Sequence, residues 1–138
     1  MNETMIINWN NVVGPEDVVY HLGDFSLRTD CNDILNLLNG EIHLIKGNHD
    51  SNKIMRHPRF SSVSPYKILR RFEKNVLLIH RPVCYDVYKH LRPKEEFDVC
   101  FYGHWHNRDL ISVENCYNVC VENINYTPVE LKKYFEER

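Results

Sequence analysis

Four short apolar runs in this 138-residue chain end in the same way, and this pattern constrains the fold more than any other feature. Each run has the length of a buried strand and is followed at once by residues that bind metals or phosphates. The four segments are Val18–Asp24, Ile42–Asp50, Leu77–Pro82 and Val99–His106. Ligands bind in open α/β sheets just beyond the carboxyl ends of the strands. The pattern therefore predicts an α/β fold with a binding site at one edge of a sheet.

The other elements follow from apolar periodicity and from helix and turn signals. Apolar residues recur at helical spacing up to Gly14, where the first helix is expected to end, and Asn39-Gly40 is a stop signal for the second. The segment Val83–Lys94 mixes tyrosines with charges and fits no single element. The expected helices are Thr4–Val13, one from Asp30 through Leu38 and one from Thr127; the expected strands are Asp17–Leu22, Glu41–Lys46, Tyr66–Phe72, Val76–Ile79, Phe97–Tyr102, Leu110–Glu114 and Tyr117–Val121, with hairpins at Glu73–Asn75 and Asn115-Cys116.

The composition is that of one ordinary globular domain over residues 1–138. Hydrophobic residues make up 43% and charged residues 26%, which excludes a disordered chain. A net charge of -2 gives no reason to expect nucleic acid or a membrane as a partner. No apolar run is long enough for a bilayer span, and the N-terminus lacks the pattern of a signal peptide, so we expect a cytoplasmic protein.

The five cysteines are odd in number and show no paired close spacing that would be typical of a zinc site. Only Cys116 and Cys120 lie near each other, and one such pair is a weak signal. We expect reduced cysteines that act as small hydrophobic residues in a cytosolic core.

The polar residues at the strand ends are typical of a divalent-metal site when they are taken together. Separately, each motif has an ordinary explanation as a turn or as a histidine satisfied in the core. His104 and His106 stand two apart on an extended chain, so their side chains project to the same side. Asp24 adds a carboxylate, Asn48 an amide oxygen and His80 an imidazole. These donor types suit manganese, iron, nickel and zinc without a sharp choice among them.

The order of these motifs resembles the calcineurin-like metallophosphoesterase family. The chain carries Gly23-Asp24, then Gly47–Asp50, then His80 after an apolar strand, then Gly103–His106, and the resemblance extends over essentially the whole chain. It implies a sandwich of two mixed β-sheets flanked by helices. It also implies an enzyme, a hydrolase that cleaves phosphodiesters or phosphomonoesters with a metal-bound hydroxide.

The resemblance also assigns roles to single residues. The expected metal ligands are Asp24 as the bridging carboxylate, Asn48, His80 and His104 with Asp24 at one ion, and His106 at the other. His49 would be catalytic together with Asp24, either as proton donor to the leaving oxygen or through a hydrogen bond to the phosphoryl group. Asn48 and His49 would contact the phosphate of a small phosphate-ester substrate. Arg28 follows Asp24 closely in the sequence, so it is either a further contact to the phosphate or a solvated surface arginine. Two ions occupy the intact family site, and manganese is the favoured metal.

One family motif has no counterpart here. The family pattern opens with a strand that ends in Asp-x-His, and nothing before Asp24 fits that motif. Asp24 and His106 alone would then hold the second ion, so one or two metals per chain are expected. An absent N-terminal strand would leave a sheet edge unpaired, and such edges pair with other chains. We therefore expect either a homodimer through this edge or a chain shortened at its N-terminus relative to its natural form.

The missing motif also supports a rival interpretation from another class of protein. In that interpretation the chain is a catalytically impaired metal-binding or scaffolding domain with one complete metal site. The sequence leaves this choice open, along with the substrate and the identity of the metal.

Overall fold

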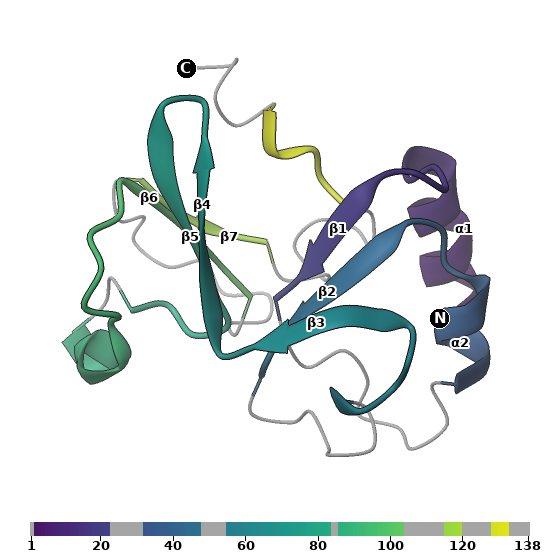
Figure 1. Cartoon of the computed structure of the whole chain (residues 1–138), viewed down its shortest axis with the longest axis horizontal. Helices are drawn as coiled ribbons and strands as arrows, with labels where there is room; N and C mark the ends of the chain where they lie inside the picture. Colours follow the sequence, from purple (N-terminus) through teal and green to yellow (C-terminus); the bar gives the residue numbers. More distant parts are fainter. Residues whose placement is uncertain are drawn as a thin grey trace.

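The computed structural model of the chain describes residues 2–22, 32–47, 55–83, 86–103, 115–119 and 128–132. Two β-sheets form its centre, and two helices flank one of them (Figure 1). The described elements are α1 (Asn2–Val12), β1 (Val18–His21), α2 (Asn32–Leu37), β2 (Glu41–Ile45), β3 (Phe60–Ser64), β4 (Tyr66–Arg71), β5 (Lys74–Ile79), the 3-10 helix η1 (Asp86–Leu91), β6 (Val99–Tyr102) and β7 (Cys116–Asn118).

The first sheet has three parallel strands in the order β1-β2-β3. The register pairs Tyr20 with His43 and His43 with Ser62, so these residues form one row across the sheet. The register between β2 and β3 shifts by one residue after Ile42. Since all three strands point the same way, their carboxyl ends lie at one edge.

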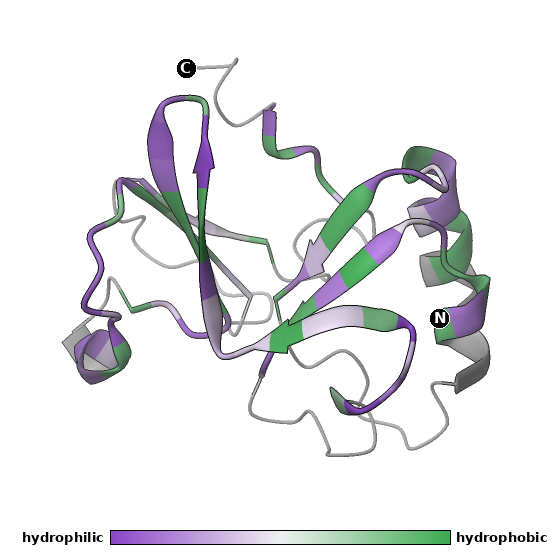
Figure 2. Cartoon of the chain, viewed as in Figure 1, coloured by the Kyte–Doolittle hydropathy of each residue, from purple (hydrophilic) through white to green (hydrophobic). Residues whose placement is uncertain are grey.

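The second sheet has four strands in the order β4-β5-β6-β7. The strands β4 and β5 form an antiparallel hairpin, whereas β5 pairs with β6 and β6 with β7 in parallel. The two turn residues of the hairpin, Phe72 and Glu73, both have positive φ angles, 54° and 64°. Figure 2 shows hydrophilic residues toward the tip of this hairpin and hydrophobic residues farther along its strands.

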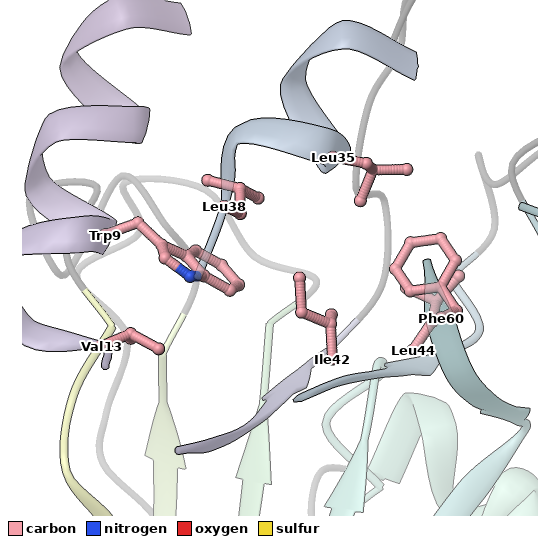
Figure 3. Close-up of a cluster of buried hydrophobic side chains, with 7 residues drawn as sticks. All are labelled: Trp9, Val13, Leu35, Leu38, Ile42, Leu44 and Phe60. Atoms are coloured by element: carbon pink, nitrogen blue, oxygen red, sulfur yellow. The ribbon is translucent and has the colours of Figure 1, made fainter. Parts of the chain in front are cut away.

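A hydrophobic cluster joins the helices to the outer face of the three-stranded sheet (Figure 3). Its buried members are Trp9, Val13, Leu35, Leu38, Ile42, Leu44 and Phe60. Hydrogen bonds reinforce the contact: Trp9 Nε1 donates to the Asn39 carbonyl at 2.9 Å, and Asn39 N–H donates to Asn10 Oδ1 at 2.8 Å. The helices thus fix the position of β2 from one side.

A second cluster fills the space between the two sheets. Its buried members are Leu22, Ile45, Leu69, Val76, Leu78, Val99 and Phe101. A third cluster, which includes Leu77, Ile79, Val83 and Cys100, covers the other face of the four-stranded sheet. Because β5 and β6 are buried on both faces, their apolar runs are nearly continuous rather than alternating.

The structure confirms the α/β class, with two sheets, and most of the expected elements. The expected strands appear as β1, β2, β4, β5 and β6, and the hairpin at Glu73–Asn75 joins β4 to β5. The ambiguous segment contains η1, and β3 was not expected. Residues 110–114, one arm of the second expected hairpin, lie outside the described residues, as does most of the expected C-terminal helix, of which residues 131–132 are seen as helical.

The expectation of reduced cysteines is wrong at one position. Cys116 is disulfide-bonded, to a partner outside the described residues. Cys100 is a free, buried thiol, as expected.

Candidate metal centre

His80 is the one predicted metal ligand whose position the structure describes. It follows β5 directly, and only 3% of its surface is exposed. Because β5 lies between β4 and β6 in the sheet, the backbone that carries the histidine is held on both sides. A buried imidazole at the end of a buried strand needs polar partners, because an unsatisfied ring nitrogen would be costly.

The partner of the His80 ring is the backbone carbonyl of Leu22, 2.6 Å from Nδ1. A carbonyl oxygen only accepts, so Nδ1 carries the hydrogen and Nε2 of the neutral ring carries the lone pair. Histidines that bind metals almost always donate their other ring N–H to a carbonyl or carboxylate in this way. The geometry therefore fits a metal ligand that binds through Nε2.

Hydrogen bonds of His80 bring three of the four sequence motifs together. Leu22 follows β1 and precedes Gly23-Asp24 in the sequence. The His80 carbonyl accepts a hydrogen bond of 3.0 Å from the N–H of Gly103, the residue after β6. The carboxyl ends of β1, β5 and β6 therefore meet at His80.

The fourth motif follows β2. Ile45, the last residue of β2, belongs to the same buried cluster as Leu22, and the Lys46 N–H donates to the Ser64 carbonyl at 2.8 Å. Gly47 is buried, directly before the predicted ligand Asn48. The predicted convergence of the strand ends is thus present in the described backbone.

The other predicted site residues lie outside the described residues: Asp24, Arg28, Asn48, His49, His104 and His106. Their roles stay predictions. Within the described ranges no cluster of three or more His, Cys, Asp and Glu side chains could hold a metal.

Sequence analysis missed the group that orients His80. The Leu22 carbonyl is a backbone atom, and nothing in a leucine side chain indicates that its carbonyl receives a histidine from the other sheet. The only available signal was positional, because Leu22 stands immediately before the Gly-Asp motif.

Cys100 is not suited to bind the same metal. Burial in β6 raises the pKa of its thiol to about 12, although the positive charge of Arg92 acts in the opposite direction. The Cys100 side chain also packs in the third cluster, on the other face of the four-stranded sheet from the cluster that contains Leu22 and Ile45.

Comparison with known protein families agrees with this arrangement. The family model described as the calcineurin-like phosphoesterase superfamily domain matches residues 5–123. The chain belongs to this superfamily. At the level of the family it is a metal-dependent phosphoesterase.

Relatives of this phosphoesterase include proteins without an assigned activity. It is 39% identical, over 95% of its length and 71% of the relative's, to an uncharacterized protein of Methanocaldococcus jannaschii. Its structure resembles a protein of unknown function from Aquifex aeolicus with a TM-score of 0.83 and 28% identity, over 99% of this chain and 84% of the other.

A more distant structure, described as a novel archaeal phosphodiesterase, matches with a TM-score of 0.54 and 21% identity, over 85% of this chain and 72% of the other. This likeness shows a shared fold. In the described part of the phosphoesterase, none of the helices has both the length and the apolar character needed to cross a bilayer.

Proposed function

We propose that this phosphoesterase hydrolyses small phosphodiesters, in preference to phosphomonoesters, with divalent metal ions at the strand ends around His80. The proposed ligands are those of the sequence analysis: Asp24, Asn48, His80, His104 and His106. The observation that carries the proposal is the hydrogen bond between His80 Nδ1 and the Leu22 carbonyl, which directs the lone pair to Nε2. Manganese is the favoured ion, and iron, nickel and zinc suit the same donors.

The chain's own side chains would bind the ester and handle its proton. Asn48, His49 and Arg28 would contact the phosphate, where a guanidinium can donate two parallel hydrogen bonds to phosphoryl oxygens. The imidazole of His49 would donate a proton to the leaving oxygen, because an alkoxide leaves poorly without one. Bound ions would add positive charge beside the phosphoryl oxygens and a source of hydroxide near neutral pH.

Turnover of two chromogenic esters after removal and return of metal tests this proposal. Bis(p-nitrophenyl) phosphate should be cleaved faster than p-nitrophenyl phosphate, with activity lost in EDTA and restored by manganese. Asp24→Asn and His80→Asn should each lower the rate about 100-fold or more. His90→Asn is the matched control, because His90 is exposed in η1 and should leave the rate unchanged. Turnover that survives EDTA would refute metal dependence.

The rival function is a metal-binding or scaffolding domain with impaired catalysis. The absent Asp-x-His motif is the observation in its favour, since it leaves Asp24 and His106 as the ligands of the second ion. Native mass spectrometry with added manganese separates the two functions. Two ions per chain with turnover support the hydrolase, whereas one ion per chain without turnover supports the rival.

We further propose a homodimer through the outer edge of β1, and a cytoplasmic location. Among the described strands β1 pairs only with β2, so one of its edges faces away from the sheet. Sedimentation of the chain over a range of protein concentrations should show the dimer, and a monomer at every concentration would refute it. The disulfide at Cys116 is unusual for a cytosolic protein, so cell fractionation tests the location directly.

A further inference from the structure

A second cluster of reactive side chain types lies on the three-stranded sheet, away from the strand ends that carry the proposed metal site. Tyr20, His43 and Ser62 are register partners in β1, β2 and β3, so they form one row. His43 stands two residues before Ile45, the last residue of β2, which is roughly 7 Å along the strand. Tyr20 packs against the cluster between the sheets, so the row belongs to the inner face.

Hydrogen bonds join a carboxylate, the imidazole and a hydroxyl in a chain. His43 Nε2 lies 2.8 Å from Glu41 Oε2, and His43 Nδ1 lies 2.5 Å from Ser62 Oγ. An ionised carboxylate only accepts, so Nε2 carries the hydrogen of the neutral ring. The lone pair is then on Nδ1, where it accepts the hydroxyl hydrogen of Ser62.

An aromatic ring stacked on the His43 imidazole also holds it in this orientation. The Tyr20 ring stacks on His43 with ring centroids 5.0 Å apart and planes 19° apart. The Lys67 ammonium, from β4 of the other sheet, lies 5.6 Å from the centroid of the Tyr20 ring. The His43 side chain is 13% exposed and the Glu41 side chain 54%, and Ser62 is also partly exposed, so reagents can approach the cluster although the row lies on the inner face.

This is the arrangement that activates a serine. A nucleophilic hydroxyl needs a base within hydrogen-bond reach, and the base needs a third group that fixes its tautomer and orientation. Ser62, His43 and Glu41 meet those three requirements, with the two ring nitrogens exchanged relative to the usual serine triad. Either nitrogen of an imidazole can accept the proton.

We propose that Ser62 is an activated nucleophile that activated acyl and phosphonyl esters modify. In the step, Ser62 Oγ forms a bond to the electrophilic carbon or phosphorus, and its proton passes to His43 Nδ1. The resulting imidazolium is paired with the Glu41 carboxylate. The leaving group departs with the electron pair of its bond, as fluoride when the reagent is a fluorophosphonate.

Labelling of the intact chain with a fluorophosphonate probe tests the proposal. Intact mass should show one adduct, and peptide mapping should place it on Ser62. Ser62→Ala should abolish the adduct, and His43→Gln should slow labelling about 100-fold, which is the low end of what a general base contributes. Glu41→Gln should slow it about tenfold. Ser64→Ala is the matched control in the same strand and should label at the wild-type rate.

Three outcomes would overturn the proposal: no adduct on the wild-type chain, an adduct at another residue, or an unchanged rate in both His43→Gln and Glu41→Gln. Circular dichroism of each variant checks that the sheet is intact, and Glu41 is exposed enough that its variant should fold. Labelling should also persist in EDTA, because none of these residues is a proposed metal ligand. The result is therefore independent of the phosphoesterase assay.

Discussion

Gly40 is the position where the structure allows the sharpest prediction about stability. It stands between α2 and β2 with a φ angle of +96°. A Cβ atom at this position would lie 2.8 Å from Val13 Cγ1 and 2.9 Å from the Asp17 carbonyl oxygen. That carbonyl accepts a hydrogen bond of 2.7 Å from the Glu41 N–H, so it cannot move away without weakening the start of β2.

Gly40→Ala should lower the free energy of unfolding by about 2–4 kcal/mol. The left-handed backbone costs a residue with a Cβ about 1–2 kcal/mol, and crowding in a packed region costs about 1–3 kcal/mol. Reduced freedom of the unfolded chain offsets roughly 0.4–1 kcal/mol. At roughly 3–5 °C per kcal/mol for a domain of this size, the Tm should fall by about 6–20 °C.

Thermal and urea unfolding followed by circular dichroism measure this loss. Gly14→Ala is the matched control, since its Cβ would meet only Asp17 Oδ2 at 3.5 Å, an ordinary contact, and its change should stay within about 0.5 kcal/mol. If the two variants differ by less than about 1 kcal/mol, the argument from backbone conformation and close approach is refuted.

Three further predictions concern other residues. Glu73→Gly should raise the free energy of unfolding by about 0.5–1 kcal/mol in urea titrations, because glycine accepts the positive φ of the hairpin turn without strain; a loss of stability would contradict this. Arg59→Met should cost about 1.5–3 kcal/mol in the same assay, because the guanidinium donates to the carbonyls of Leu38 and Gly40 at the end of α2, while Arg56→Met, an exposed control, should cost little. The buried Cys100 thiol, with its pKa raised to about 12, ionises first in the unfolded chain, so stability should fall from about pH 9 toward pH 12 by up to about 1.4 kcal/mol per pH unit. Urea midpoints at several pH values should show a shallower decline in Cys100→Ala, and identical slopes would exclude this thiol as the cause.

The sequence was sufficient to predict the strands that are buried. In β5 and β6 the apolar runs are nearly unbroken, because both faces of these strands are covered, and such runs are visible in any sequence. The position of His80 at the end of a buried strand could be predicted for the same reason, since it directly follows one of these runs.

The strand β3 could not be predicted on the same grounds. Its sequence, Phe60–Ser64, contains three serines, and Pro65 follows directly, which is typical of a loop. The strand forms because Phe60 is buried in the cluster under the helices and because β2 supplies a neighbour to pair with. Tertiary contacts therefore overrode local preference.

The cluster at Ser62 was hidden for a related reason. His43 and Ser62 are 19 residues apart, and their contact depends on the register of β2 and β3. That register shifts after Ile42, and no local signal in the sequence indicates the shift. Pairing between parallel strands is set by packing of the whole domain, which a single sequence does not display.

The two sheets differ in how far apart in the sequence their paired strands lie, and this affects the order in which the chain folds. Two residues connect β4 to β5 in the hairpin. By contrast, some twenty residues separate β1 from its partner β2, and some twenty separate β5 from its partner β6. Local pairs form in microseconds, while distant parallel pairs are slow. The loops that carry the proposed metal ligands follow those slow strands, so the metal centre should be assembled last. A chain caught during refolding should therefore have its hairpin formed before it has any affinity for metal.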